Sequence, residues 1–320
     1  MLYVIHREYQ LTEKILHGIR DRKNVLFIKL EEIEVNFVID ILSRAECLFF
    51  TSFFLNKKYT PQFISQLQEI THEDKVLLWD IVDIRSCTFI KRTIKTVNIS
   101  IWIWNPIKSI SHNTIFQSSL LFFLKRNSKN ICTFDPDDAK HHNLMLKSQV
   151  YFYDDSQDLN TTMHHNKYDV VFIGADKGRI NELIKIYELL HNLGISTYFH
   201  IFSDIDRHYS NEELKYIAKD HISYSQVIEI IKNAACILEI TQEGQSGATI
   251  RVMESIFHKK KLISNNLHLL DMDTYLTKNI FFLGHDDEKQ LLNFINSEFT
   301  PIEKECYEKH DINNWIQCFY

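Results

Sequence analysis

Short runs of apolar residues recur along the first half of the chain, and amphipathic segments separate them. Runs with the length of buried strands cover residues 24–28, 47–51, 75–79, 99–104 and 131–134. Residues 35–44 and 61–70 lie between such runs and have the apolar spacing of helices. Continuous apolar strands that alternate with helices are typical of a parallel sheet covered on both faces. The pattern therefore predicts an α/β domain in the first half.

A polar stretch near residues 154–166 interrupts this pattern and is the best candidate for a linker. The alternation then starts again with an apolar strand over residues 168–174, followed by a helix that stops at Gly194. Further strands are predicted over residues 195–202, 236–240, 261–264 and 280–283, and helices over residues 223–234 and 249–258. We predict two Rossmann-like doubly wound α/β domains that face a cleft, over residues 1–160 and 161–305.

Composition and charge exclude several classes of protein. Hydrophobic residues make up 45% of the chain and charged residues 24%, which is typical of a globular protein rather than a disordered or fibrous one. The formal charge of −6 lacks the basic surplus of a general nucleic-acid binder, so we expect no nucleic-acid partner. Six scattered cysteines without a C-x-x-C pair favour free thiols in a reducing compartment.

The apolar runs also bear on the membrane. No uninterrupted run approaches the roughly 20 residues of a membrane-spanning helix, and residues 1–7 are too short and too soon charged for a signal peptide. We therefore predict a cytoplasmic protein and leave open a peripheral contact with the inner face of the membrane.

The segment with the most chemical information covers residues 241–254, between a predicted strand and a predicted helix. Two of the seven glycines of the chain lie in it, and small residues there let a ligand approach the backbone. N–H groups at the start of a helix favour a phosphate, and Arg251 in the first turn opposes the helix dipole unless an anion is near. The alternative is a tight turn in which Arg251 pairs with Glu254 at the i,i+3 spacing.

Residues 174–179 also join a predicted strand to a predicted helix. They contain the glycines Gly174 and Gly178 and the cations Lys177 and Arg179, which suggests a second phosphate contact. The alternative is a flexible entry to the helix. The segment is not a Walker loop, because no G-K-[ST] follows it.

Residues 244–254 (GQSGATIRVME) and 259–266 (KKKLISNN) carry a resemblance to a known family. They resemble the donor-binding region of GT-B glycosyltransferases, above all bacterial enzymes of lipopolysaccharide, capsule and exopolysaccharide synthesis. The motif of those enzymes reads Q-S-G-x-T-x-R-x-x-E and then K-K-L-I-x-x-N. Residues 168–174, 223–234 and 314–315 are also similar, so the resemblance covers the second half of the chain well and the first half weakly.

The resemblance implies transfer of a sugar from a nucleotide-sugar donor to a hydroxyl of a glycan or lipid-linked oligosaccharide, without a metal or other cofactor. The donor diphosphate would meet the glycine-containing loop, and a carboxylate on the helix would bind the ribose. The donor contacts would be Gly174, Lys177, Arg179, Gln245, Ser246, Gly247, Thr249, Arg251 and Glu254. The resemblance also implies a last helix, over residues 306–320, that packs back toward the first domain.

One position departs from the pattern of the family. Glu254 matches the second glutamate of the broader E-x7-E pattern, but Ser246 stands where the first glutamate is expected. This departure leaves the retaining or inverting outcome of the transfer open.

Glycosyl transfer to an alcohol benefits from a base that takes the proton of the hydroxyl. In GT-B enzymes such a base usually comes from the acceptor-side domain, so Asp135 and Asp138 are the catalytic candidates, with Asp80 and Asp83 beside them. The alternative is that the Asp-Pro-Asp-Asp segment supplies only a turn and a helix N-cap.

Other chemistries are less favoured by the sequence. The histidine pairs at residues 141–142 and 164–165 lack a carboxylate or cysteine at a familiar ligand spacing, so we expect no metal site. Ser246 resembles the nucleophile of a G-x-S-x-G hydrolase turn, but Ala248 replaces the last glycine. Two alternatives keep the GT-B architecture, namely a sugar-nucleotide epimerase and a catalytically silent subunit that binds a partner transferase.

Overall fold

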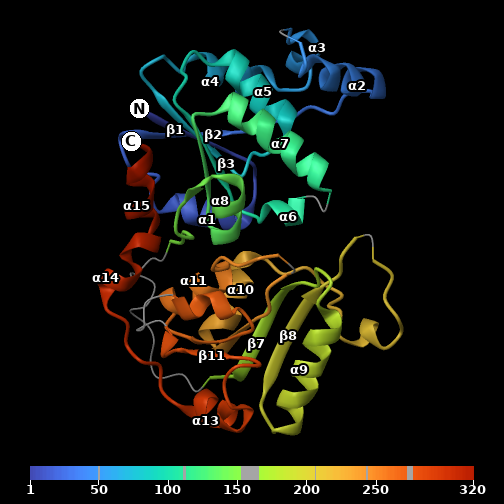
Figure 1. Cartoon of the computed structure of the whole chain (residues 1–320), viewed down its shortest axis with the longest axis vertical. Coiled ribbons are helices and arrows are strands. Elements are labelled where there is room, and N and C mark those ends of the chain that lie inside the picture. The colour runs from blue at the N-terminus through green and yellow to red at the C-terminus, as the bar shows by residue number, and fades with distance from the viewer. Residues whose placement is uncertain (50, 111–112, 153–165, 206, 243, 272–276) are drawn as a thin grey trace. The chain divides into compact units, whose positions relative to one another are not determined.

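A computed structural model describes the chain apart from residues 50, 111–112, 153–165, 206, 243 and 272–276 (Figure 1). The chain forms two compact units. Unit 1 contains residues 1–148 and 312–320, and unit 2 contains residues 149–311. The boundary predicted between residues 160 and 161 lies outside the described residues.

Unit 1 is built on a parallel sheet with the strand order β2-β1-β3-β4-β5-β6. Its strands are β1 (Leu2–His6), β2 (Val25–Lys29), β3 (Lys75–Trp79), β4 (Ile99–Ile103), β5 (Asn130–Thr133) and β6 (Met145–Leu146). Strand β1 is buried along its whole length and pairs with both β2 and β3. Because both of its faces are covered, the strand needs the continuous apolar sequence that it has.

Helices α2, α4, α5, α7 and α8 of unit 1 begin at side chains that accept hydrogen bonds from the first turn. The Asn36 side chain accepts from the N–H of Ile39, and the Thr60 hydroxyl accepts from that of Phe63. The helices are α1 (Gln10–His17), α2 (Phe37–Glu46), α3 (Phe53–Asn56), α4 (Pro61–Gln68), α5 (Ile84–Thr93), α6 (Ile107–Ile110), α7 (Thr114–Asn127), α8 (Pro136–His142) and α15 (Ile312–Trp315).

An aromatic cluster ties the C-terminal residues to unit 1. The ring of Trp315 packs edge-on against Trp79 and Trp102, with ring centroids 5.5 and 4.9 Å away. The indole N–H of Trp315 donates to the carbonyl oxygen of Ser148 at 2.9 Å. Residues 312–320 are therefore part of the core of unit 1, whereas residues 306–311 belong to unit 2.

One predicted strand of unit 1 is wrong, and two strands were missed. Helix α2 continues to Glu46, and Cys47 to Phe49 form its end and a turn in place of a strand. Cys47 is buried in the core of unit 1, whereas Leu48 and Phe49 are exposed and cover surface. The missed strands are β1, which sequence reasoning considered only as a signal peptide, and the two-residue β6.

Unit 2 has a five-stranded parallel sheet with the order β11-β10-β9-β7-β8. The strands are β7 (Tyr168–Ala175), β8 (Thr197–Phe202), β9 (Ala234–Glu239), β10 (Lys261–Ser264) and β11 (Ile280–Phe282). The helices are α9 (Ile180–Asn192), α10 (Tyr224–Lys232), α11 (Ile250–Phe257), α13 (Leu291–Asn296) and α14 (Lys304–Tyr307). Short 3-10 helices lie at Glu213–Lys215, Leu267–Asp271, Glu288–Gln290, Glu308–His310 and Ile316–Phe319, the last of them in unit 1.

Each sheet has one point at which the winding direction reverses. In unit 1 it lies between β1 and β3, and in unit 2 between β7 and β9. Right-handed crossovers send the chain to opposite faces of the sheet on either side of such a point. The loops that follow the two strands therefore separate and leave a crevice at the carboxyl ends, which is where open α/β sheets bind ligands.

Candidate functional site

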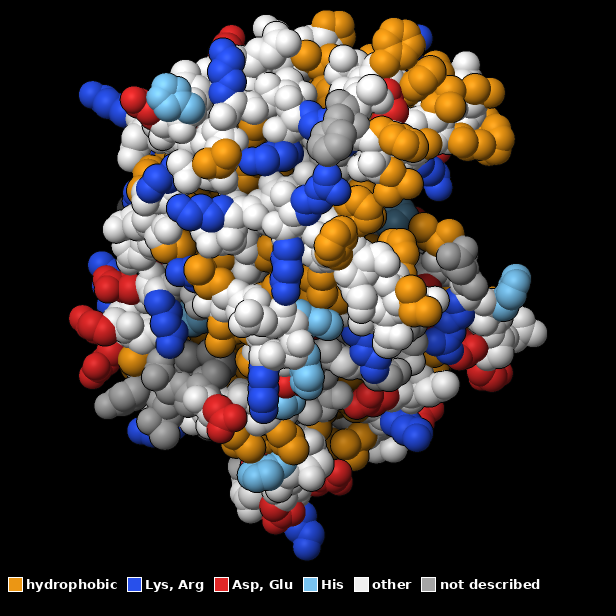
Figure 2. Space-filling view, turned by 45° about the horizontal axis from the view of Figure 1, so that its top comes forward, with side chains coloured by type: hydrophobic (Ala, Val, Ile, Leu, Met, Phe, Trp, Pro, Cys, Tyr) orange, Lys and Arg blue, Asp and Glu red, His pale blue; other side chains and the backbone are white. Residues whose placement is uncertain are grey.

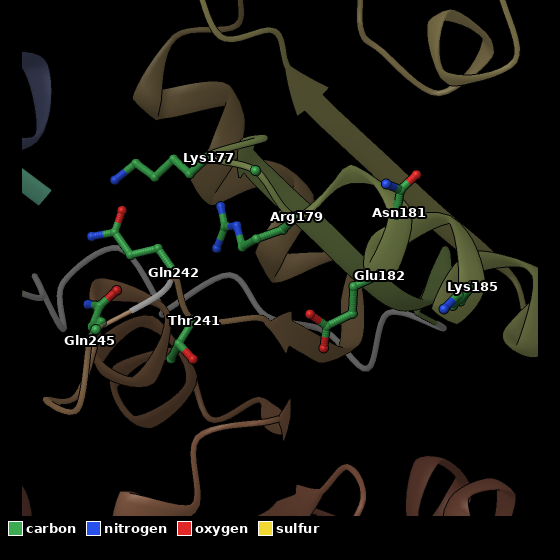
Figure 3. Close-up of a pocket in the computed structure, with 10 residues that line it drawn as sticks. Lys177, Arg179, Asn181, Glu182, Lys185, Thr241, Gln242 and Gln245 are labelled. Atoms are coloured by element: carbon green, nitrogen blue, oxygen red, sulfur yellow. The ribbon is translucent and has the colours of Figure 1, made fainter. Parts of the chain in front are cut away.

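A cavity of about 760 Å³ lies in unit 2 where the loops after β7 and β9 separate (Figure 3). One wall comes from the β7–α9 loop and the first turns of α9, and the other from the β9–α11 loop. The lining residues are Lys177, Gly178, Arg179, Asn181, Glu182, Lys185, Thr241, Gln242, Gly244 and Gln245. The cavity thus occupies the point that the strand order alone marks as a binding site.

The β7–α9 loop turns sharply through two residues with left-handed backbone. Lys177 has a φ of 47° and Gly178 a φ of 80°. A Cβ atom on Gly178 would meet no other atom within 4 Å, so backbone conformation rather than space requires glycine there. The turn lifts the exposed side chain of Lys177 to the same side of the cavity as Gln242 (Figure 3).

Asp176 holds this loop from beneath. Its buried carboxylate accepts hydrogen bonds from the N–H of Ile180 at 2.6 Å and from the hydroxyl of Tyr209 at 2.9 Å. It also forms a 2.9 Å ion pair with Arg207. Because Ile180 is the first residue of α9, Asp176 fixes the start of the helix that faces the cavity.

Arg179 connects the two walls of the cavity. Its Nε donates to the carbonyl oxygen of Asp176 at 2.9 Å, and its two terminal nitrogens donate to the carbonyl oxygens of Ala175 and Ile240. Ile240 directly follows β9, so the guanidinium joins the two loops of the switch point. Burial lowers the pKa of Arg179. Three of its five N–H donors serve these carbonyls, and among the described residues nothing accepts from the other two, which can serve a ligand.

The β9–α11 loop is held by a buried carboxylate at its base. Thr249 begins α11, where its hydroxyl oxygen accepts from the N–H of Arg251 at 3.0 Å and its O–H donates to Glu239. Glu239 also accepts from the hydroxyl of Ser264 at 2.6 Å. Burial raises the pKa of Glu239. The hydroxyl of Thr249 is thereby engaged inside unit 2.

Arg251 and Glu254 form an i,i+3 ion pair, which the sequence analysis gave as the alternative to an anion site. Nη1 of Arg251 lies 2.6 Å from Oε2 of the fully buried Glu254. The other carboxylate oxygen of Glu254 accepts a hydrogen bond from the hydroxyl of Tyr224 at 2.8 Å. The Tyr224 hydroxyl also lies 2.9 Å from the hydroxyl of Tyr151. Burial raises the pKa of Glu254, and the charge of Arg251 acts against this rise.

The predicted donor residues therefore divide into two groups. Lys177, Arg179 and Gln245 line the cavity. Within the part of the chain that the structure describes, the lining does not include Gly174, Ser246, Gly247, Thr249, Arg251 or Glu254. Ser246 and Gly247 lie on the neighbouring stretch of loop, where their carbonyl oxygens accept from the side chain of Asn266 at 3.3 and 3.4 Å.

Sequence reasoning missed several residues of the cavity and its support. Asn265 accepts hydrogen bonds from the N–H of Thr241 at 2.9 Å and donates to Glu182 at 3.2 Å, so it links the two walls. Asn181 and Lys185 line the cavity from α9. Their place in the sequence could have identified Asn265 and Asn266, because both directly follow β10 and therefore lie at the same edge of the sheet as the two loops.

The catalytic candidates in unit 1 start two helices. Asp135 is buried at the start of α8 and accepts from the N–H groups of Asp137 and Asp138, both at 3.1 Å. Asp138 accepts from the N–H of Ile107, the first residue of α6, at 2.8 Å. Burial raises the pKa of Asp138 to about 6. The N-cap chemistry weighed in the sequence is present, and a catalytic role of either residue stays a prediction.

The switch point of unit 1 brings Asp80 and Asp83 close to Arg7. Arg7 forms ion pairs with Asp83 at 2.7 Å and with Glu32 at 2.9 Å. Asp80 has a left-handed backbone, with a φ of 53°, and accepts from the N–H of Trp104 at 2.9 Å. Burial raises the pKa of Asp80 to about 6.

The described residues show neither a cluster of metal ligands nor a membrane-spanning helix. Within the described part of the chain, no group of three or more histidines, cysteines, aspartates and glutamates could hold a metal ion. His141 bonds instead to the carbonyl oxygen of Asp137 at 2.8 Å, and the pair at residues 164–165 lies outside the described residues. Among the described helices, none has the length and apolar character needed to cross a membrane.

No protein-family model matches the chain, and no curated protein matches it by sequence. Solved structures match its fold along the whole chain. An alpha-glucosyltransferase in complex with UDP and a mismatched 13-mer DNA aligns with a TM-score of 0.58 and 10% identity, covering 100% of this chain and 99% of that chain. The trehalose-6-phosphate synthase OtsA aligns at 0.56 and 10%, covering 99% and 97%. S. aureus MnaA with UDP aligns at 0.51 and 9%, covering 98% and 97%.

At such identities the likeness establishes the fold. The predicted class of two doubly wound α/β units, like those of GT-B glycosyltransferases, is confirmed.

Proposed function

We propose that this chain is a glycosyltransferase that moves a sugar from a nucleotide-sugar donor to a hydroxyl of a bacterial surface glycan. The acceptor belongs to lipopolysaccharide, capsule or exopolysaccharide synthesis, as a glycan or a lipid-linked oligosaccharide at the cytoplasmic face of the membrane. The observation that carries the proposal is the cationic cavity at the β7/β9 switch point. Similar folds with bound UDP agree with a donor of this class.

The charges around the cavity suit a diphosphate. Lys177 and Lys185 line it and form no ion pair with another described residue, and Arg179 keeps two donors for a ligand. The side chain of Lys177 is exposed as a whole, but partial desolvation of its ammonium group and then the charge of Arg179 lower the pKa of Lys177. An anion bound between Lys177 and Arg179 offsets the repulsion between their charges. The start of α9 adds the positive end of a helix dipole to the attraction for that anion. No metal is needed to neutralise the diphosphate in this arrangement.

The remaining predicted donor residues take two different roles in the proposal. Gln245 lines the cavity, Ser246 and Gly247 follow it in the β9–α11 loop, and Gly174 lies at the end of β7 ahead of the lining loop. Thr249, Arg251 and Glu254 position the loop from behind through the contacts to Glu239 and Tyr224. A ribose contact of Glu254 would need its buried carboxylate to turn away from Arg251, so we assign it to positioning.

The acceptor hydroxyl needs a base, and Asp138 has suitable acid–base properties in unit 1. With a pKa of about 6 it is ionised at neutral pH and still basic enough to take a proton as the glycosidic bond forms. Asp135 fixes the backbone N–H of Asp138 and thereby positions it. We keep both residues as the catalytic pair of the proposal.

The proposal is tested by binding and by turnover. A panel of nucleotide sugars is screened by thermal shift, in which a ligand at 100 times its dissociation constant stabilises by about 2.7 kcal/mol. The best ligand is then incubated with glycan and lipid-linked acceptors, and both transfer and donor hydrolysis are measured. We expect stabilisation by one donor and its transfer. If no nucleotide sugar stabilises the chain, the proposal is wrong. Binding without any turnover would point to a silent subunit.

A further inference from the structure

Helix α2 of unit 1 and the turn to α3 present large apolar side chains to the outside. The exposed fractions are 78% for Phe37, 61% for Val38, 46% for Ile41, 66% for Leu48, 63% for Phe49 and 62% for Phe53. We call these six residues the apolar face. Figure 2 shows hydrophobic side chains gathered over this part of unit 1, at the upper right.

The inward side of α2 is polar, which is the reverse of an ordinary surface helix. Asp40 binds Arg85 and lies 3.7 Å from Nζ of Lys58. The buried Glu46 accepts from the N–H groups of Phe54 and Leu55, both at 2.8 Å. These contacts fix α2 with its carboxylates turned inward, so the apolar face is an ordered part of the fold.

Cations surround the apolar face. Arg44 lies on α2, is mostly exposed and pairs at 2.9 Å with Asp40, a carboxylate that Arg85 and Lys58 also contact. Nζ of Lys57 stands 4.5 Å from the ring centroid of Phe53. Arg92 donates to the carbonyl oxygens of Glu46 and Phe49 at the end of the helix. Burial lowers the pKa of Arg92, and the nearby Cys47 and Glu46 act against this shift. The contacts of α2 and the following turn bring together more cations than carboxylates, a local positive surplus in a chain of net charge −6. The cations are Arg44, Lys57, Lys58, Arg85 and Arg92, and the carboxylates are Glu32, Asp40 and Glu46.

We propose that the apolar face docks on a bilayer that contains anionic phospholipids, with α2 lying in the plane of the interface. Outward aromatic and aliphatic side chains insert among the headgroups, and cations at their edge contact the lipid phosphates. The long stems of Lys57 and Arg44 let the charges remain in water while the apolar side chains enter the membrane. The charge complementarity selects an anionic membrane over a neutral surface.

This inference deepens the proposed function, because a lipid-linked acceptor is reached from a membrane, but its evidence is independent of the donor cavity. The test uses the full chain and flotation with two kinds of vesicle. One kind is pure phosphatidylcholine, and the other also contains phosphatidylglycerol. We expect binding to the anionic vesicles only, and weaker binding as salt is raised.

Variants separate the apolar and cationic contributions. Phe49→Ser/Phe53→Ser should lower partitioning into anionic vesicles about tenfold or more, because two exposed rings no longer insert. Lys57→Gln should lower it about fivefold, following the contribution of one cation near a charged surface. The control is Ile205→Ser/Leu214→Ser, which changes two exposed apolar residues of unit 2 and should leave partitioning unchanged. Circular dichroism and melting temperature verify that each variant is folded.

Two outcomes overturn the inference. The first is a folded wild type that does not bind anionic vesicles, or that binds as strongly after Phe49→Ser/Phe53→Ser. The second is self-association of the wild type in sedimentation, abolished by the same variant and without vesicle binding, which would assign the apolar face to a contact between copies. Calorimetry of donor binding is run in parallel, so that failure of the donor site and failure of membrane docking are seen separately.

Discussion

The two units contain the same topological feature with opposite chemistry. In unit 1 the loops after β1 and β3 bring Arg7 together with Asp83, and Glu32 joins them from the segment after β2, so the cation is already neutralised by the protein. In unit 2 the loops after β7 and β9 surround a cavity with Lys177 and Lys185 on its wall. A doubly wound sheet thus provides the position of a site, whereas the side chains decide which ligand can bind there.

The difference extends to how each switch point is supported. Asp176 in unit 2 is fully buried and serves a helix start, a tyrosine and an arginine at once. Asp83 in unit 1 begins α5 and pairs with Arg7, but both side chains are well exposed. Buried contacts should matter more to stability than exposed ones, because solvent screens the latter. The predictions below test this comparison.

The largest expected effect is on stability in unit 2. Asp176→Asn leaves Arg207 without its buried partner and should lower the free energy of unfolding by about 3 kcal/mol. Asp83→Asn, the matched change in unit 1, should cost about 1 kcal/mol or less. Urea unfolding of both variants measures this. Equal losses would show that the two switch points are supported in the same way.

Arg251→Ala should cause the next largest loss in the free energy of unfolding, about 2 kcal/mol, because it removes the charge that faces the buried Glu254. From the sequence alone, this substitution was expected to leave the fold intact or slightly more stable.

The loss should depend on pH. Burial raises the folded-state pKa of Glu254, and removing Arg251 raises it further. The folded variant therefore holds a proton that the unfolded chain releases, so the variant is most stable below the unfolded pKa and loses stability as pH rises. Unfolding at pH 5 and pH 8 should show the larger deficit at pH 8. A deficit that shrinks as pH rises would contradict the assignment.

Lys177→Gln addresses the ligand rather than the fold. The variant keeps a polar, unbranched stem, one atom shorter, but loses the charge that faces the cavity, so nucleotide-sugar affinity should fall about tenfold to a hundredfold. The melting temperature without ligand should change little, because Lys177 is exposed. Lys215→Gln in the same unit and Arg7→Gln at the other switch point are the controls. If calorimetry shows the same loss of donor affinity for Arg7→Gln as for Lys177→Gln, the donor does not distinguish the switch point of unit 2 from that of unit 1.

The sequence predicted the fold better than the contacts of the site. The alternation of apolar strands and helices was sufficient for two α/β units, and Lys177, Arg179 and Gln245 were identified from their loops and lie on the cavity. The sequence could not reveal that Thr249 would bind Glu239, a residue ten positions away on β9. Such contacts depend on how loops fold back over the sheet edge, which local pattern does not encode.

The failure in unit 1 has the same origin. The run at residues 47–51 has the composition of a strand, and only the inward carboxylates Asp40 and Glu46 of α2 account for the outward position of Leu48 and Phe49. Burial by tertiary contacts, rather than local hydrophobicity, decides between strand and surface.

The smallest expected effect concerns Asp80 at the switch point of unit 1. Burial raises its pKa to about 6 from an ordinary 3.8, so the folded chain binds a proton more tightly than the unfolded chain does. The contribution of Asp80 to stability is therefore fully present below the unfolded pKa and is lost as pH rises through about 6. Asp80→Asn keeps a neutral side chain at every pH and should remove a slope worth about 1 to 2 kcal/mol between pH 4 and pH 7. Asp83→Asn, whose site is open to solvent, should leave that slope in place. Chemical unfolding across this pH range decides the matter. If Asp80→Asn keeps the full slope, the carboxylate of Asp80 is solvated in the folded chain and another group causes the pH dependence.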